Sequence, residues 1–454
     1  SIVFELLGDT LAVACAKIWM SGAPFSELGS YVNSGKALAM IMGILVSVII
    51  AFVAGLVIQY ILRLIFTFQY ERMYRWAGGI FGAVSLTAIL YFLVMKGARG
   101  ASFMQPEWIL WMDENTEEIL IGVLAFWFVV FQSAIIFLRA NIFPFIILSG
   151  TFALAFAFAG NDLVNFVGVP VAALDSFHLF TAQPGADPEV MTMGGLRTIT
   201  HTPTLILAGS GVVMCLTLWF SKKAHRVIRT AVNLSSATRG GKEQFGSSLP
   251  ARVMVRSALR MNDVFHQIIP KSVFAALDTR FVKPRPKPGQ IELPFDELRA
   301  SVNLVLAAAL IASATSMKLP LSTTYVTFMV AMGSSLSDRA WDRESAVYRI
   351  SGVLTVITGW FLTAFSAATA CGFVASLMAF WGEPVILIGM IFALCVIART
   401  NFFTKEAPEE TEETARQVDK GDQSSICELL TTNVNHYLDR TLTVFSDGLV
   451  AFLR

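Results

Sequence analysis

Three polar residues, Asn161, Asp162 and Asn165, interrupt the apolar segment of residues 140–174. An ionised carboxylate inside such a segment costs several kcal/mol unless it is paired or binds a cation. Asn161 and Asp162 carry the hard oxygen ligands that an alkali cation prefers, while the Asn165 amide can also donate to an anion. Gly160 permits the helix to break, which would free backbone carbonyls for a cation. We therefore predict a cation site at Asn161 and Asp162; the alternative is a hydrogen-bonded clasp between helices.

A second polar group consists of three consecutive hydroxyl residues, Ser322, Thr323 and Thr324, which follow Pro320 between two apolar runs. The proline is expected to end one helix, and the hydroxyl residues then open the next. A helix N-terminus presents unsatisfied N–H groups and a positive dipole, and hydroxyls add donors without adding charge. The pattern predicts a dehydrated socket for an oxyanion, with ordinary N-capping as the alternative.

Composition restricts the class of protein. Hydrophobic residues make up 55% of the 454 residues and charged residues only 15%, against about 25% charged in a typical soluble domain. This excludes an ordinary cytosolic enzyme, a disordered chain and a nucleic-acid binder, and the net charge of +1 indicates no polyanionic partner. The five cysteines show neither a CxxC pair nor a zinc-ligand spacing, so we expect no disulfide framework and no metal beyond a Na⁺ at Asn161 and Asp162.

Uncharged runs of roughly 20 residues, long enough to cross a bilayer, predict an all-α integral membrane protein built as a polytopic helical bundle. The clearest runs are residues 37–62, 77–95, 119–138, 140–161, 202–221 and 350–382, with a shorter one at 385–398. Two more, residues 300–317 and 319–337, are separated by Lys318 alone. Because Pro320 follows this single charge, we expect a re-entrant hairpin rather than two full spans.

Basic residues in the loops predict the orientation, since short cytoplasmic loops retain positive charge. Residues 222–298 hold fourteen Lys or Arg against six Asp or Glu, which indicates a cytoplasmic loop. Counting spans backwards places Arg63, Arg72 and Arg75 inside as well. The same count places the acidic segment of residues 107–118 outside, as the rule expects.

The chain also contains a weak internal repeat. Residues 1–8 align with residues 326–333, and Ser34-Gly35 aligns with Ser351-Gly352. In the predicted orientation, the span after Gly35 starts outside whereas the span after Gly352 starts inside. Two similar units of opposite orientation are typical of secondary transporters, whose substrate site lies near the bilayer midplane between the repeats.

The two polar motifs resemble those of a known family. AGNDLVNF at residues 159–166 is similar to the signature motif of the inorganic phosphate transporter (PiT) family, and KLPLSTTY at residues 318–325 is similar to the Ser-Thr-Thr hairpin tip of that family. The resemblance covers roughly residues 1–399 and implies inverted repeats that hold phosphate next to coupling cations. It assigns the cation site to Asn161 and Asp162, and the phosphate site to the following residues: Asn165, Ser322, Thr323 and Thr324.

In this family each motif occurs twice, once in each repeat, and the copies of the first repeat are absent here. Because Ser1 begins inside an apolar helix, we expect further residues in front of it. Six segments are predicted: 1–66, the remainder of the first repeat; 67–139, connecting transmembrane helices; 140–221, the start of the second repeat; 222–298, the basic cytoplasmic loop; 299–400, the second repeat with its hairpin; and 401–454, a cytoplasmic acidic linker with an amphipathic helix that needs a partner surface.

The predicted function is secondary active import of inorganic phosphate by Na⁺ or H⁺ symport with alternating access, in the plasma (inner) membrane as a multi-pass protein. No enzymatic activity and no cofactor besides the coupling cation are expected. The residues leave open a related oxyanion such as sulfate, a membrane-embedded enzyme that uses Asp162 as a base, and a purely structural membrane scaffold. They also leave open the oligomeric state, a homodimer included, and the choice of Na⁺ or H⁺.

Overall fold

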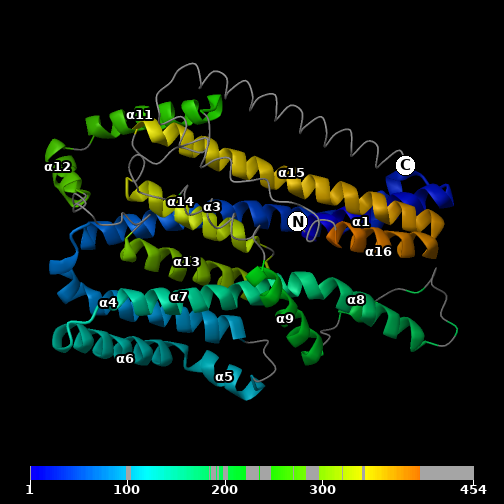
Figure 1. Ribbon diagram of the computed structural model, residues 1–454, viewed down its shortest axis with the longest axis horizontal. Coiled ribbons are helices and arrows are strands. Elements are labelled where there is room, and N and C mark those ends of the chain that lie inside the picture. Colours follow the sequence, from blue (N-terminus) through cyan, green and yellow to red (C-terminus); the bar gives the residue numbers. More distant parts are fainter. Residues whose placement is uncertain are drawn as a thin grey trace. The chain divides into compact units, whose positions relative to one another are not determined.

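The structure, a computed structural model, describes residues 2–98, 104–183, 185, 191, 194–197, 203–220, 235, 247–268, 270–282, 296–319, 321–339 and 343–398. These residues are largely helical and contain no strand (Figure 1), which confirms the predicted all-α class. The predicted acidic linker and amphipathic helix at 401–454 lie outside the described residues.

The helices of the described residues have the following bounds: α1 (Ile2–Ser21), η1 (Phe25–Glu27), α2 (Leu28–Tyr31), α3 (Ser34–Phe66), α4 (Glu71–Leu90), η2 (Tyr91–Gly97), α5 (Pro106–Glu114), α6 (Thr116–Phe137), α7 (Phe143–Phe158), η4 (Ala159–Leu163), α8 (Val164–Thr181), η5 (Gly194–Arg197), α9 (Thr204–Phe220), α11 (Leu249–Ile268), α12 (Lys271–Arg280), α13 (Glu297–Ser316), α14 (Thr323–Ser337), α15 (Arg343–Trp381) and α16 (Glu383–Ala398). The chain forms two compact units, Ser1–Phe380 and Trp381–Arg454, and the elements discussed below, apart from the last residue of α15, belong to the first unit.

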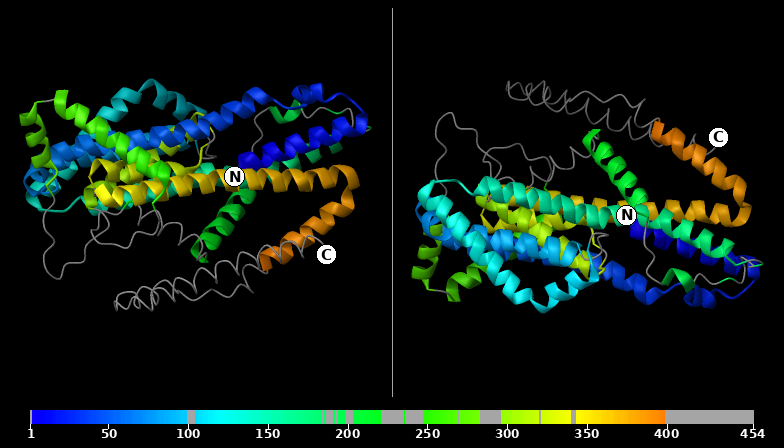
Figure 2. Two further views of the ribbon diagram at one scale, coloured as in Figure 1. Left: turned by 90° about the horizontal axis from the view of Figure 1, so that it is seen from above. Right: turned by 90° about the horizontal axis from the view of Figure 1, so that it is seen from below.

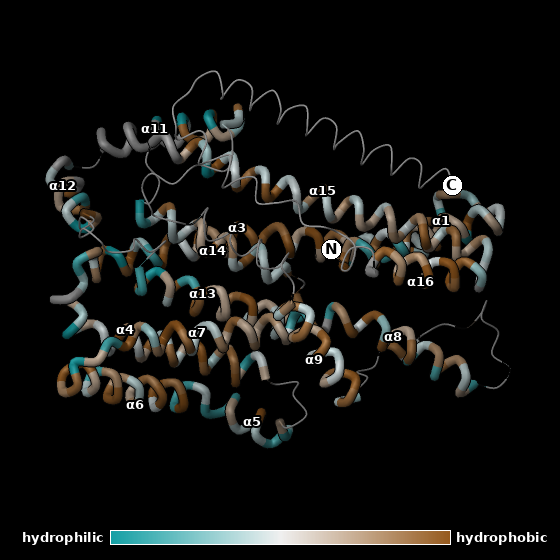
Figure 3. Tube along the Cα trace, in the orientation of Figure 1, coloured by the Kyte–Doolittle hydropathy of each residue, from teal (hydrophilic) through white to brown (hydrophobic). Residues whose placement is uncertain are grey.

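Six helices among the described residues are long and apolar enough to cross a membrane: Ser34–Phe66, Met73–Gly97, Thr116–Phe137, Phe143–Thr181, Glu297–Ser316 and Ala346–Trp381. Their apolar residues line the helices along much of their length (Figure 3), and many face outward; Phe137 of α6, for example, is 81% exposed. Water would penalise such a surface, whereas lipid would not, so the chain is a membrane-spanning protein. Within the predicted span of residues 202–221, the described residues form α9 (Thr204–Phe220).

Helices α13 and α14 form a hairpin, whose re-entrant course stays a prediction, and α13 ends earlier than the position of Pro320 suggested. It ends at Ser316, where the Lys318 N–H donates to Thr315 O at 3.0 Å and the Leu319 N–H donates to Ala314 O at 2.9 Å. Lys318 itself lies in the left-handed region with φ +56°. Two such hydrogen bonds around a left-handed residue form a Schellman cap, a common way for helices to end. This cap, and not Pro320, therefore ends α13.

One face of α3 is buried along the second half of the helix. The buried residues Ala51, Gly55, Gln59 and Arg63 recur every four residues and so share a face, which packs against α14. A side chain at Gly55 would place its Cβ 2.5 Å from the Val330 carbonyl oxygen. The two backbones therefore approach as closely as they do because this position has no side chain.

A comparable crossing joins α1 and α15, which lie side by side in both views of Figure 2. A Cβ on Gly8 would collide with the backbone of Ala368, and a Cβ on Gly372 would lie 2.9 Å from the Gly8 carbonyl oxygen. Close crossings through small residues are a common way for helices to associate in lipid, where burial of apolar surface provides no driving force.

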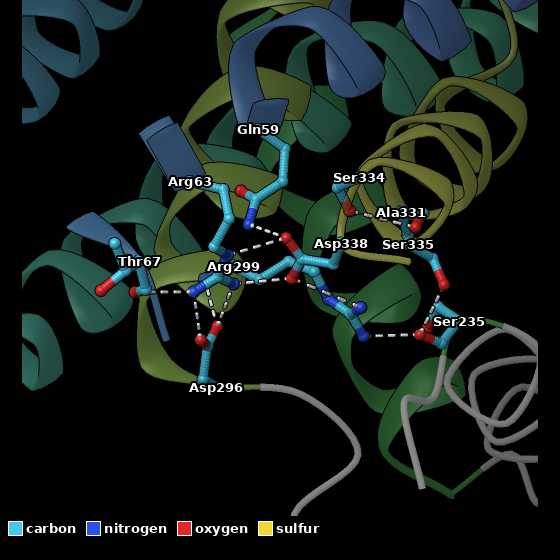
Figure 4. A network of polar contacts seen from close by, with 10 residues as sticks. All are labelled: Gln59, Arg63, Thr67, Ser235, Asp296, Arg299, Ala331, Ser334, Ser335 and Asp338. Carbon is cyan, nitrogen blue, oxygen red and sulfur yellow. Dashed lines mark hydrogen bonds and ion pairs between the residues drawn. The ribbon is translucent and has the colours of Figure 1, made fainter. Parts of the chain in front are cut away.

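A buried network of charges fastens the base of the hairpin to α3 (Figure 4). Arg63 donates to the Asp338 carboxylate through Nε at 2.9 Å and through Nη2 at 2.6 Å, and to Asp296 Oδ2 through Nη1 at 2.8 Å. Gln59, one turn earlier on α3, adds a 2.8 Å bond to Asp338. Asp296 precedes α13 and Asp338 follows α14. The first arm therefore begins, and the second arm ends, beside the same arginine, Arg63.

The network is deeply enclosed. Arg63 and Arg299 are fully buried and Asp338 is 2% exposed, and Arg299 Nη1 lies 3.8 Å from Asp338. Burial by itself would raise the pKa of Asp296, but the Arg63 guanidinium together with the N–H and the guanidinium of Arg299 outweighs that effect, and the pKa lies below its usual range. Asp296 is therefore ionised at neutral pH, and the arginine stays paired with it.

Replacing Arg63 by Leu is expected to destabilise the protein by about 3–5 kcal/mol, because the Asp338 and Asp296 carboxylates would lose their partner in an enclosed site. Asp278→Asn is the matched control: it breaks the 2.7 Å ion pair with Arg339, whose two side chains are half exposed, and should cost at most about 1 kcal/mol. Thermal unfolding of the purified protein in detergent measures both. Equal losses in the two variants would show that the network does not hold the hairpin.

Candidate functional site

Asp162 lies in η4, a single π-helical turn that joins α7 to α8. The expected break at Gly160 is therefore wrong. The helix widens over this one turn and then continues as a regular helix to Thr181. A π-turn skips the ordinary i→i−4 bond and is frequent at functional sites. The interruption seen in the sequence is real, but it takes the form of a bulge rather than an unwound segment.

The first residue of α14 meets this turn. The Thr323 hydroxyl donates to the Asp162 carboxylate, at 2.9 Å from Oδ2 and 3.1 Å from Oδ1. The two residues are 161 positions apart in the chain, so the contact depends on packing of α7 against α13. Thr323 is only 3% exposed. The two motifs that the sequence singled out separately therefore form one polar site.

Asn161 completes the immediate environment of the carboxylate. Its side-chain Nδ2 donates to Asp162 Oδ1 at 3.0 Å, and the residue is 8% exposed. In the part of the chain that the structure describes, no basic side chain forms an ion pair with Asp162. Two neutral donors offset part of the cost of placing the half-buried carboxylate between apolar helices, and a bound cation would offset the remainder.

The other predicted ligands lie nearby with fewer contacts. Ser322 takes the N-cap position of α14, but its side chain makes no capping hydrogen bond. The expected alternative of ordinary capping by this residue is thus not seen. Thr324 is exposed, and Asn165 is half-buried on the first turn of α8, where no hydrogen bond joins it to another described residue. Their role as phosphate ligands stays a prediction.

An aromatic contact that sequence reasoning missed lies behind the hairpin tip. Tyr325 stacks on Trp360 of α15, with ring centroids 3.7 Å apart and planes 12° apart, and Phe328 meets the same indole edge-on at 5.5 Å. Tyr325 is two residues after Thr323, so the two side chains project from opposite sides of the helix. The tip is thus held between Asp162 on one side and Trp360 on the other.

Two cavities lie near the π-turn. A small one of about 30 Å³ is lined by Gly160, Thr315 and apolar residues, which is room for about one or two water molecules. A larger one of about 920 Å³ lies between α8 and α9 and has an almost wholly apolar lining. Ser322, Thr323 and Thr324 line neither of these two cavities.

Comparisons of the chain with models of protein families, with curated proteins and with solved structures find no match.

Replacing Trp360 by Leu removes the ring that supports Tyr325 and should loosen the hairpin tip without unfolding the bundle. We expect amide hydrogen exchange of residues 321–327 to become faster, measured by mass spectrometry in detergent. Trp76→Leu is the control, since that indole is 79% exposed. If both variants leave exchange at the tip unchanged, the stack does not position Thr323.

Proposed function

We propose that the protein is a secondary active transporter that imports inorganic phosphate together with a cation, Na⁺ or H⁺, through the plasma (inner) membrane. The observation that carries the proposal is the contact between Asp162 and Thr323. It brings a half-buried carboxylate, without a basic partner among the described residues, next to a helix N-terminus bearing hydroxyls. A cation and an oxyanion bound side by side would neutralise one another in such a place.

The glycine crossings support the inverted repeat. Gly55 lies 21 residues after Ser34, and Gly372 lies 21 residues after Ser351. Each of these glycines marks a close backbone crossing, of α3 with α14 and of α15 with α1. Equivalent positions of the aligned spans therefore serve the same packing purpose.

The second member of each crossing is also equivalent. Gly8 and Gly333 end the aligned segments 1–8 and 326–333, and a Cβ on either would collide with the backbone of the partner span. The helix α3 ends at the Arg63 network, whereas α15 begins a few residues after Asp338 of the same network. The two aligned spans thus run in opposite directions, as inverted repeats require.

The shared hydroxyl suggests how the two ligands are coupled. Thr323 has one hydroxyl hydrogen, and Asp162 now accepts it. A cation or a proton on the carboxylate lowers its strength as an acceptor, so the hydroxyl is free to turn and donate to phosphate. Phosphate that accepts the Thr323 hydroxyl would in turn remove this hydrogen bond from Asp162, which favours binding of the cation or the proton to the carboxylate. By linkage, each ligand then raises the affinity for the other by the same factor.

The coupling is tested by phosphate binding to the full-length protein with and without Na⁺, and at two pH values. In the wild type, the coupling cation should tighten phosphate binding by about 5–150-fold. Thr323→Val and Asp162→Asn should abolish this dependence, and Thr323→Ser should restore it because the hydroxyl is kept. Thr327→Val, which removes a hydroxyl bonded to Thr323 O one turn later, is the matched control and should keep the wild-type dependence.

The outcomes separate two failures. Wild-type protein that binds no phosphate under any of these conditions, and takes none up in proteoliposomes, would overturn phosphate transport. Phosphate binding whose cation dependence survives Thr323→Val would leave transport standing and remove the role of the shared hydroxyl.

The orientation can be tested in intact cells. Cysteines introduced as Ser247→Cys and Glu117→Cys in a cysteine-free background are expected to lie inside and outside respectively, since basic residues surround the former and acidic residues the latter. An impermeant maleimide should label only the second. The reverse pattern would overturn the predicted orientation.

A further inference from the structure

Helix α11 carries a stripe of arginines. Arg252, Arg256 and Arg260 follow one another at intervals of four residues and so lie on one face. All three are exposed, and α11 separates polar from apolar residues more strongly than any other described helix. Arg252 donates to Ser247 Oγ at 2.6 Å, whereas Arg256 and Arg260 bond to no other residue in the described ranges.

Large apolar side chains accompany this stripe. Leu249, Val253 and Met254 are 76%, 60% and 53% exposed. In water, such a helix would keep its aliphatic side chains exposed to solvent, which costs free energy. The boundary between lipid headgroups and acyl chains suits both kinds of residue, because arginines reach the phosphates while aliphatic groups enter the acyl region.

The neighbouring helix α12 holds α11 near the end of a candidate span. Phe281, at the end of α12, stacks on Tyr60 of α3 with ring centroids 5.5 Å apart, and Asp278 of α12 pairs with Arg339 at 2.7 Å. Tyr60 lies in the last two turns of α3, a helix long enough to cross a membrane. Figure 1 shows α11 and α12 at the end of the unit where α3 ends. The level at which a span ends is that of the lipid headgroups.

We propose that α11 is an interfacial helix that binds anionic phospholipid headgroups through Arg252, Arg256 and Arg260. The charge of the stripe selects anionic over zwitterionic lipid, and each arginine near an anionic surface strengthens the association about fivefold. The proposal does not depend on what the protein transports, since it concerns only the membrane that the candidate spans already require.

The test uses the whole chain in nanodiscs of phosphatidylcholine, with and without about one third phosphatidylglycerol. An environment-sensitive fluorophore is attached to a cysteine introduced as Ser257→Cys, an exposed position of α11, in a cysteine-free background. With the anionic lipid, we expect a blue shift and stronger quenching by lipids that carry a nitroxide near the headgroup, both reduced by high salt.

Replacing the three arginines of α11 by Gln should abolish the response to anionic lipid. The matched control replaces three other exposed arginines by Gln, Arg75, Arg139 and Arg280, which changes the net charge equally and should keep the response. Equal fluorescence in the two lipids would overturn the proposal and direct attention to an acidic protein partner. Equal loss in the two triple variants would overturn it as well, because it would reduce the effect to net charge.

Discussion

Arg63 and Asp338 can occupy an enclosed apolar site only as a pair, and this constraint determines much of the architecture. The pair requires the end of α14 to reach α3, while the second carboxylate, Asp296, brings the start of α13 to the same guanidinium. The first arm of the hairpin therefore begins, and the second arm ends, at one point. Glycines at the α3–α14 crossing then allow the backbones to approach closely enough for the arginine to reach.

The hairpin consequently has two unlike ends. Its base is rich in full charges that compensate one another, and its tip offers only hydroxyls to a carboxylate that lacks a basic partner in the described chain. Paired charges hold a fixed geometry, because separating them in a low dielectric is costly. A hydrogen bond from a hydroxyl to a carboxylate involves only one charge, so it is weaker than a buried ion pair and easier to exchange. The division places rigidity at the base and leaves exchangeable contacts at the tip, where ligands are proposed to bind.

The spans and the hairpin could be predicted from the sequence because uncharged length alone identifies a membrane helix. Asp162 and Thr323 also stood out in the sequence, since polar residues are costly inside apolar runs. Their mutual contact was not derivable, and neither was the pairing of Arg63 with Asp338 across 275 positions, because local patterns say nothing about which distant helices pack together. Trp360 was missed for a similar reason: one aromatic residue in a long apolar helix looks like any lipid-facing side chain. The prediction of a helix break at Gly160 was wrong because glycine permits several irregular backbone conformations, and the sequence does not indicate which of them forms.

The π-turn at Asp162 has a consequence for helical phase. A π-turn contains one residue more than the α-helical path around it, and each residue of an α-helix advances the azimuth by about 100°. The residues of a π-turn each advance the azimuth by less, so the five residues Ala159–Leu163 turn the chain about as far as four residues of a regular helix would. Deleting one of them would therefore restore a regular helix and leave the apolar faces of α8 directed at their present neighbours, while the widened backbone beside Asp162 would be lost. The bulge thus confines one extra residue to the polar site and keeps the rest of the continuous rod in phase.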